Sequence, residues 1–161
     1  MIRHFSAGGI VYNKVSGQTL FLLRKSNPTT SFYSAINWSL PKGWLDDEAP
    51  GRPGPKTLGQ KRATTEEVEQ VALREVREET GVEAKIISRL GTDQFYFVDQ
   101  NKQKVFKTVI YFLMEFVRYL PEGFGPETSE IAWKDLVEAS NLLRRRKGEL
   151  ELIKKAAALI V

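Results

Sequence analysis

The sequence of 161 residues contains no cysteine and a single histidine, His4. Without cysteine the chain has no disulfide framework and no thiolate chemistry. One histidine, placed beside the first expected strand, argues against a Ser-His-Asp triad and against a histidine-ligated metal centre. No apolar run approaches the roughly 18 residues of a membrane span, and the N-terminus lacks the charged-then-apolar layout of a signal peptide. We therefore expect a cytoplasmic protein without a membrane partner.

The length fits one domain, 1–161, with a sizeable core. Its 24 basic side chains slightly exceed the 20 acidic ones, which gives a net charge of +4. This mild charge favours polyanionic ligands such as nucleotides without requiring a duplex nucleic acid. Residues 46–63 are rich in proline and glycine and poor in apolar side chains, which predicts a mobile loop. Its basic side chains would either close over a polyphosphate or have no role.

The segment 72–82 carries three glutamates, Glu75, Glu78 and Glu79, at spacings i, i+3 and i+4. On a helix these carboxylates share an arc of roughly 100°. Like charges at this spacing repel each other, so the cluster does not stabilise a bare helix. One interpretation is an ordinary solvated helix face. The other is a site for a divalent cation, because Mg²⁺ prefers carboxylate oxygens, with Arg74 orienting Glu78 from one turn earlier.

The surroundings of the cluster favour the second interpretation. The upstream segment 40–43 reads Leu-Pro-Lys-Gly, and Gly81 stands where the end of a helix favours glycine. Together these segments resemble the Nudix box, G-x5-E-x7-R-E-U-x-E-E-x-G-U, where U is aliphatic. The second half of that motif matches without a gap, at Arg74, Glu75, Val76, Glu78, Glu79, Gly81 and Val82.

The first half of the motif departs from this pattern. The pattern places its opening glycine fourteen residues before the arginine, whereas Gly43 lies 31 residues before Arg74. The difference is an insertion of 17 residues within 44–63. Counting back from the arginine assigns the first glutamate of the motif to Glu66, and counting forward from the glycine points near Glu48. We prefer Glu66, because 64–67 reads Thr-Thr-Glu-Glu and also predicts a capping box that opens the helix.

Apolar patterning predicts a mixture of strands and helices. Strands are expected at 6–12, 19–23, 38–40, 84–90, 93–98, 105–119 and 130–133, and helices from 64 to 80, 134–147 and 149–160. The segment 27–37 is polar and irregular, and it is expected to form the lip of a site. This order predicts an α/β fold, and the family resemblance implies a Nudix-type α/β/α sandwich with a mixed β-sheet.

The resemblance also implies chemistry. Nudix enzymes hydrolyse a nucleoside diphosphate linked to another group, X, with the help of Mg²⁺ or Mn²⁺. The metal ligands implied by the motif are Glu75, Glu78, Glu79 and the backbone carbonyl of Gly43. Arg74 is expected to orient these carboxylates, and Lys42 is a candidate phosphate contact. The general base is expected to be Glu127 or Glu130, unless a motif glutamate or a metal-bound hydroxide suffices.

The segment 107–111, Lys-Thr-Val-Ile-Tyr, is similar to a stretch in the diadenosine tetraphosphate (Ap4A) hydrolase branch of the family. The resemblance implies that Lys107 binds phosphate and that an aromatic residue on the preceding strand, Tyr96 or Phe97, stacks on a base. Tyr111 is a further substrate-binding candidate from the same segment. The expected partner is therefore a small nucleotide, with Ap4A cleaved to ATP and AMP.

Other functions are compatible with the same motif. The basic run 144–147 either suits the end of a helix or contacts an RNA 5′ end, as in an RNA pyrophosphohydrolase. Nucleotide sugars and damaged nucleoside triphosphates are alternative substrates. A nucleotide- or RNA-binding module without turnover is the alternative outside enzymes, although such modules usually lose the motif glutamates that this chain retains.

Overall fold

The computed structural model describes residues 1–28 and 38–160. The site lip predicted at 27–37 lies almost wholly outside the described residues. The strands and helices are β1 (Ile2–Val15), β2 (Gln18–Ser26), β3 (Trp38–Ser39), β4 (Lys42–Trp44), β5 (Asp47–Ala49), β6 (Arg52–Pro53), α1 (Thr65–Thr80), β7 (Val82–Val98), β8 (Lys104–Tyr119), β9 (Thr128–Lys134), α2 (Leu136–Leu142) and α3 (Lys147–Leu159).

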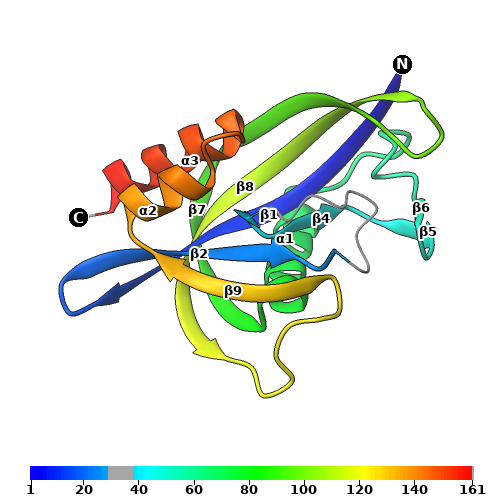
Figure 1. Ribbon diagram of the computed structural model, residues 1–161. Helices are drawn as coiled ribbons and strands as arrows, with labels where there is room; N and C mark the ends of the chain where they lie inside the picture. The colour runs from blue at the N-terminus through cyan, green and yellow to red at the C-terminus, as the bar shows by residue number, and fades with distance from the viewer. Residues whose placement is uncertain (29–37, 161) are drawn as a thin grey trace.

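The main sheet is mixed, as the sequence predicted, and runs in the order β3-β2-β1-β8-β7. β1 and β8 pair in parallel from Ile2–Val105 to Tyr12–Glu115, and the other pairs are antiparallel. Side chains of β8 alternate between two cores: Tyr111 packs toward α2 and α3, whereas Phe112 packs toward α1. Helices therefore cover both faces of the sheet, which confirms the α/β/α sandwich (Figure 1).

The sheet forks along β1, and this fork positions the site. The second half of β1 pairs with β2, beginning at Tyr12–Phe21, whereas its first half pairs with β4 through Ala7–Gly43. β2 continues instead beside β3 and β9. Among the described strands β4 pairs with β1 alone. The backbone groups on the other edge of β4 can therefore contact side chains of α1.

Helix α1 begins and ends at the predicted residues. Thr64 accepts a hydrogen bond from the backbone of Glu67, whose side chain accepts one from Thr64 N, which completes the capping box. At the other end Gly81 has φ +70°, a left-handed conformation that suits glycine, and it donates to the Arg77 carbonyl. Local sequence signals thus set both ends of the helix that carries the glutamates.

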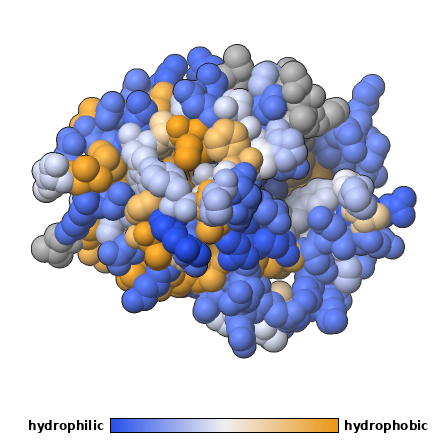
Figure 2. All heavy atoms as spheres, turned by 90° about the horizontal axis from the view of Figure 1, so that it is seen from below, coloured by the Kyte–Doolittle hydropathy of each residue, from blue (hydrophilic) through white to orange (hydrophobic). Residues whose placement is uncertain are grey.

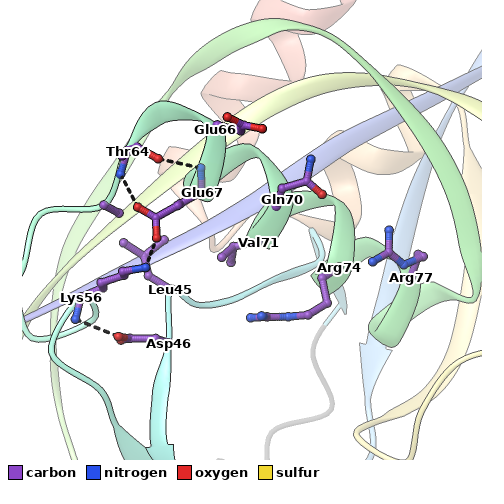
Figure 3. Close-up of a pocket in the computed structure, with 11 residues that line it drawn as sticks. Leu45, Asp46, Lys56, Thr64, Glu66, Glu67, Gln70, Val71, Arg74 and Arg77 are labelled. Carbon is purple, nitrogen blue, oxygen red and sulfur yellow. Dashed lines mark hydrogen bonds and ion pairs between the residues drawn. The ribbon is translucent and has the colours of Figure 1, made fainter.

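The segment 46–63, predicted to be a mobile loop, contains more local structure than its composition indicates. It contains the β5–β6 hairpin, and Thr57 is fully buried. The Asp46 carboxylate accepts hydrogen bonds from the backbone N–H of Lys56 (3.0 Å) and Thr57 (2.8 Å). Lys56 also forms an ion pair with Glu67 in the first turn of α1 (Figure 3). The segment thus has hydrogen bonds and an ion pair that its composition does not reveal, and its mobility stays a prediction.

The remaining differences concern element boundaries. The two strands expected at 84–90 and 93–98 form one strand, β7, with irregular register to β8. The helix expected at 134–147 ends at Leu142. The basic run 144–147 lies between α2 and α3, and its last residue, Lys147, is the first residue of α3. Arg144 donates to the Asn141 carbonyl near the end of α2, so one basic residue does suit a helix end.

The surface differs between the two ends of the molecule. On the face seen in Figure 2, apolar side chains form patches over one half, whereas the end that carries β5 and β6 is mostly hydrophilic. Among the described residues, no helix is both long and apolar enough to cross a membrane.

Candidate active site

The three glutamates of α1 lie in different environments. Glu79 is 8% exposed, and the Glu75 side chain is 12% exposed. The Glu78 side chain is 61% exposed. The i, i+4 pair therefore lies on the buried side of the helix, and Glu78 lies at its rim.

Strand β4 contacts both buried carboxylates. A Cβ atom on Gly43 would lie 2.1 Å from the carboxylate carbon of Glu75, so any side chain at this position would displace the glutamate. The backbone N–H of Lys42 donates to Glu79 Oε1 at 3.0 Å. The structure thus brings the motif lysine and glycine together with the helix, in spite of the insertion between them.

Burial and like charges make these carboxylates costly to ionise. Burial raises the pKa of Glu75 to about 7, helped by the charges of Glu79 and Glu78 and opposed by Arg74. Burial also raises the pKa of Glu79, with Arg24 as the main opposing charge. A bound cation would relieve both the repulsion and the lost hydration.

The donor set suits a cation that retains much of its water. Among the described residues no group of three His, Cys, Asp or Glu side chains forms a ready metal cage. Mg²⁺ does not need one, because it is usually bound through one or two carboxylates and keeps several waters. Two buried carboxylates beside a glycine backbone therefore fit Mg²⁺ better than they fit a metal that requires a closed protein cage.

Arg74 lies where the motif predicts. Its guanidinium is 3.4 Å from Glu75 Oε1 and 3.9 Å from Glu78 Oε1, and it also contacts the Trp44 carbonyl at 3.5 Å. It can orient both carboxylates toward β4. Glu66 is exposed in the first turn of α1 and lines the cavity in Figure 3 with the insertion.

Arg24 was missed by the sequence analysis. It is 8% exposed, and its Nε lies 3.7 Å from Glu79 Oε1. It also donates to the Glu127 carbonyl at 2.7 Å and to Thr128 Oγ1 at 2.9 Å. The sequence shows Arg24 only as a charged residue after the apolar run of β2. Its role could not be predicted, because its partners lie far away in the sequence.

Replacing Arg24 with glutamine is expected to weaken Mg²⁺ binding about tenfold, because residues that orient a metal ligand typically contribute this much. Lys25→Gln is the matched control, since Lys25 pairs with Glu130 at 3.9 Å in a solvent-exposed position and such pairs contribute little. Calorimetric titration of both variants with Mg²⁺ measures the difference. Equal affinities would show that Arg24 does not position Glu79.

The two candidate bases are separated by the structure. Glu127 lines a cavity of about 540 Å³ together with Glu78 and Glu79. Glu130 instead pairs with Lys25 across β9 and β2. Because side chains alternate along a strand, Glu130 points to the face opposite its neighbour Ile131, which packs on the α1 side. The structure thus places Glu127, and not Glu130, on the cavity with the carboxylates, so Glu127 is the preferred candidate for the base.

Lys107 approaches the carboxylates from the other face of the sheet. It lines a second cavity, of about 500 Å³, together with His4, Trp44 and Phe97. Burial lowers the pKa of Lys107 to about 7, and the charge of Lys42 lowers it further. Glu79 and Glu75 oppose this shift, so the lysine interacts electrostatically with the predicted metal ligands.

Two predicted substrate contacts, Tyr96 and Tyr111, lie away from the Lys107 cavity. Tyr96 pairs with Phe106, at 4.8 Å between ring centroids, on the face opposite Lys107. The neighbouring Phe97 faces the cavity, so Tyr96 is replaced as the stacking candidate. Tyr111 is fully buried in the core under α2 and α3. It shares a face with Lys107 but lies about 13 Å further along the strand, which removes it from the substrate contacts.

Known proteins share this combination of fold and site. It consists of a mixed sheet between helices and of two shielded carboxylates, on α1, beside the open edge of β4. The family model of the NUDIX domain matches residues 2–156. The chain therefore belongs to the Nudix family, as the motif resemblance predicted.

Similar proteins agree with this assignment. A Mycobacterium tuberculosis protein named "Putative mutator protein MutT4" is 31% identical over 160 residues, covering 96% of this chain and 57% of that protein. The chain thus spans little more than half of this relative. An Ap4A hydrolase from C. elegans has a TM-score of 0.64 at 22% identity, covering 96% of both chains. The NUDIX domain of Shewanella oneidensis NrtR, complexed with ADP ribose, has a TM-score of 0.65 at 17% identity, covering 98% of this chain and 88% of that one. These structures share the fold.

Proposed function

We propose that this protein is a pyrophosphohydrolase that cleaves a phosphoanhydride bond in a nucleoside diphosphate linked to a further group, with Ap4A as the preferred substrate. The observation that carries the proposal is the arrangement of charge. Buried Glu79 and half-buried Glu75 meet the open edge of β4, while half-buried Lys107 approaches from the opposite face. This arrangement supports a site in which the carboxylates bind a cation and the lysine binds phosphate.

The proposed metal ligands are Glu75, Glu78, Glu79 and the carbonyl of Gly43, with Mg²⁺ or Mn²⁺ as the cation. When bound, the cation supplies charge neutralisation for the phosphate oxygens. Arg74 and Arg24 hold the carboxylates in place through the contacts described above.

The protein side chains supply the remaining steps. Lys42 and Lys107 bind the phosphates and stabilise the charge that develops on the leaving group. Glu127, on the cavity that contains Glu78 and Glu79, accepts a proton from the attacking water. Cleavage of a phosphoanhydride depends mainly on such positioning and charge stabilisation.

Two similar proteins support a nucleotide substrate. One is an Ap4A hydrolase and another is complexed with ADP ribose, and Ap4A and ADP ribose both contain an adenosine joined to a chain of phosphates. The net charge of +4 also favours a polyanionic ligand.

The products formed from Ap4A test the proposal. We expect asymmetric cleavage to ATP and AMP in the presence of Mg²⁺, with little turnover after chelation. Chromatography identifies the products, and isotopically labelled water marks the attacked phosphorus. Formation of two ADP molecules would contradict the proposed position of cleavage. Faster release of pyrophosphate from triphosphorylated RNA would assign the protein to RNA 5′ ends, and binding without turnover of any substrate would indicate a binding module.

A further inference from the structure

The cavity beside Lys107 has three walls. His4 comes from the start of β1 and Trp44 from β4, which follows the site glycine. Phe97 comes from the end of β7, next to the polar turn that leads into β8. The third wall is formed by Pro53 and Leu58 of the insertion, with the hairpin tip at Gly51.

We infer that the insertion at 46–63 determines substrate specificity, because it forms the outer wall of a pocket that binds the base of the substrate nucleoside. The inference deepens the proposed function and rests on it for the position of the phosphates. The volume of about 500 Å³ lies within the range of small-molecule sites.

Aromatic rings favour a planar occupant. The His4 ring packs edge to face against Trp44, at 5.6 Å between centroids, and against Phe97, at 6.1 Å. An aromatic cluster of this kind can bind a flat heterocycle through stacking and edge contacts with its outer rings. Burial and the charge of Lys107 lower the pKa of His4, so near neutral pH this wall presents uncharged rings.

Polar groups are available to hydrogen-bond with the edge of a base. His4 is 7% exposed, and among the described residues its Nδ1 has no hydrogen-bond partner. The β7–β8 turn contributes Gln100, Asn101 and Gln103 to the cavity wall. Apolar walls with a few convergent polar groups are typical of a site that binds an organic ring and fixes its orientation.

Lys107 links the pocket to the carboxylates, which lie on the opposite face of β4. Trp44 directly follows Gly43, whose backbone lies against Glu75. One residue along a strand spans about 3.3 Å. Lys107 belongs to the cavity wall and interacts electrostatically with Glu75 and Glu79. A nucleoside in the pocket would therefore direct its phosphates past Lys107 toward the carboxylates.

The insertion is fixed well enough to serve as a wall. The Thr57 carbonyl accepts a hydrogen bond from Phe5 N at 2.8 Å, and Asp46 accepts two bonds from 56–57. The ion pair between Lys56 and Glu67 ties the same segment to α1 (Figure 3). Leu58, the next residue, is thus held on the cavity before a ligand binds, which lowers the entropic cost of binding.

The test compares ADP with inorganic pyrophosphate, which lacks a base. Leu58→Phe is designed to fill the pocket, and Leu58→Ala removes the contact with little risk to folding. Calorimetric titrations in Mg²⁺ are expected to show that wild type binds ADP at least tenfold more tightly than pyrophosphate. Leu58→Phe should lose that tenfold advantage and keep its pyrophosphate affinity. Lys61→Ala, an exposed change in the same insertion that does not line the cavity, should match wild type.

Two results would overturn the inference: equal binding of ADP and pyrophosphate by wild type, or unchanged ADP affinity in folded Leu58→Phe and Leu58→Ala. If Leu58→Phe fails to give a cooperative thermal transition, Leu58→Ala decides, with an expected loss of about threefold for ADP alone. Base-dependent binding without hydrolysis of any substrate would reject the proposed function and retain the pocket. Hydrolysis of Ap4A together with base-independent binding would reject the pocket and retain the proposed function.

Discussion

Glu79→Gln is expected to lower kcat/KM for Ap4A at least about a hundredfold at saturating Mg²⁺. Residues that only orient a metal ligand typically contribute 10- to 100-fold, and a ligand itself contributes more. The fold should persist, because a glutamine oxygen can still accept the hydrogen bond from Lys42 N. Steady-state kinetics with circular dichroism measures both effects. Glu69→Gln, on the same helix, is the control, and near-wild-type turnover of Glu79→Gln would refute the metal assignment.

Glu75→Gln should reduce turnover similarly and also change the pH dependence of stability. The pKa of Glu75 is about 7 in the folded protein against 4.5 as the ordinary value. Between these values the folded state binds more protons than the unfolded state, so the free energy of unfolding falls as pH rises. The metal-free wild type should therefore lose up to about 3 kcal/mol between pH 4.5 and 7 relative to Glu75→Gln. Denaturant titrations in chelator would reveal parallel curves if Glu75 is not responsible.

Lys107→Ala is expected to lower kcat/KM by about 10²- to 10³-fold, the range found when one preorganised donor is removed from a developing negative charge. The variant should bind Mg²⁺ at least as tightly as wild type, because Lys107 is not a proposed ligand and its charge opposes a cation at Glu75 and Glu79. Lys104→Ala is the matched control: its ammonium lies 4.5 Å from the centroid of the Tyr96 ring, on the same strand but away from the cavity. Similar losses in both variants would show that the effect is not specific to the phosphate site.

The pH profile gives an independent test of Lys107. The pKa of Lys107 is about 7 in the metal-free protein, and a cation that neutralises Glu75 and Glu79 would lower it further, so the lysine of the metal-bound protein loses its charge at about pH 7 or below as pH rises. The kcat/KM of wild type should therefore fall on the alkaline side. Arginine stays protonated throughout this range, so Lys107→Arg should lack that alkaline decline even if its overall rate is lower. An identical alkaline limb in both proteins would assign the decline to another group.

Features that depend on neighbouring residues were predictable from the sequence. The capping box at Thr64 and Glu67, the terminal glycine at 81 and the spacing of Glu75 and Glu79 all act within a few residues. These signals predicted both ends of the helix, and the motif then identified Lys42 and Gly43 in spite of the insertion. The long apolar strand 105–119 was predictable because burial on both faces leaves a continuous apolar run.

Features that depend on distant residues were not predictable. Arg24 reaches Glu79 and the 127–128 backbone through the fork in the sheet, and no local pattern encodes that contact. The face of Tyr96 depends on the pairing register between β7 and β8, since a shift of one residue exchanges the two faces. The contacts of the insertion, made by the Asp46 carboxylate, the Lys56–Glu67 ion pair and the Thr57 carbonyl, are not revealed by composition.

The parallel pairing of β1 with β8 has a consequence for how the chain folds. Ile2 pairs with Val105 and Tyr12 with Glu115, so the central pair of the sheet closes a loop of about a hundred residues. Closing such a loop costs entropy before any contact rewards it, which makes folding slow compared with helical bundles of this size. On the ribosome, β1 cannot pair with β8 until β8 has been synthesised and has emerged. Its apolar face is exposed meanwhile, which makes that interval the one in which a chaperone would protect the nascent chain.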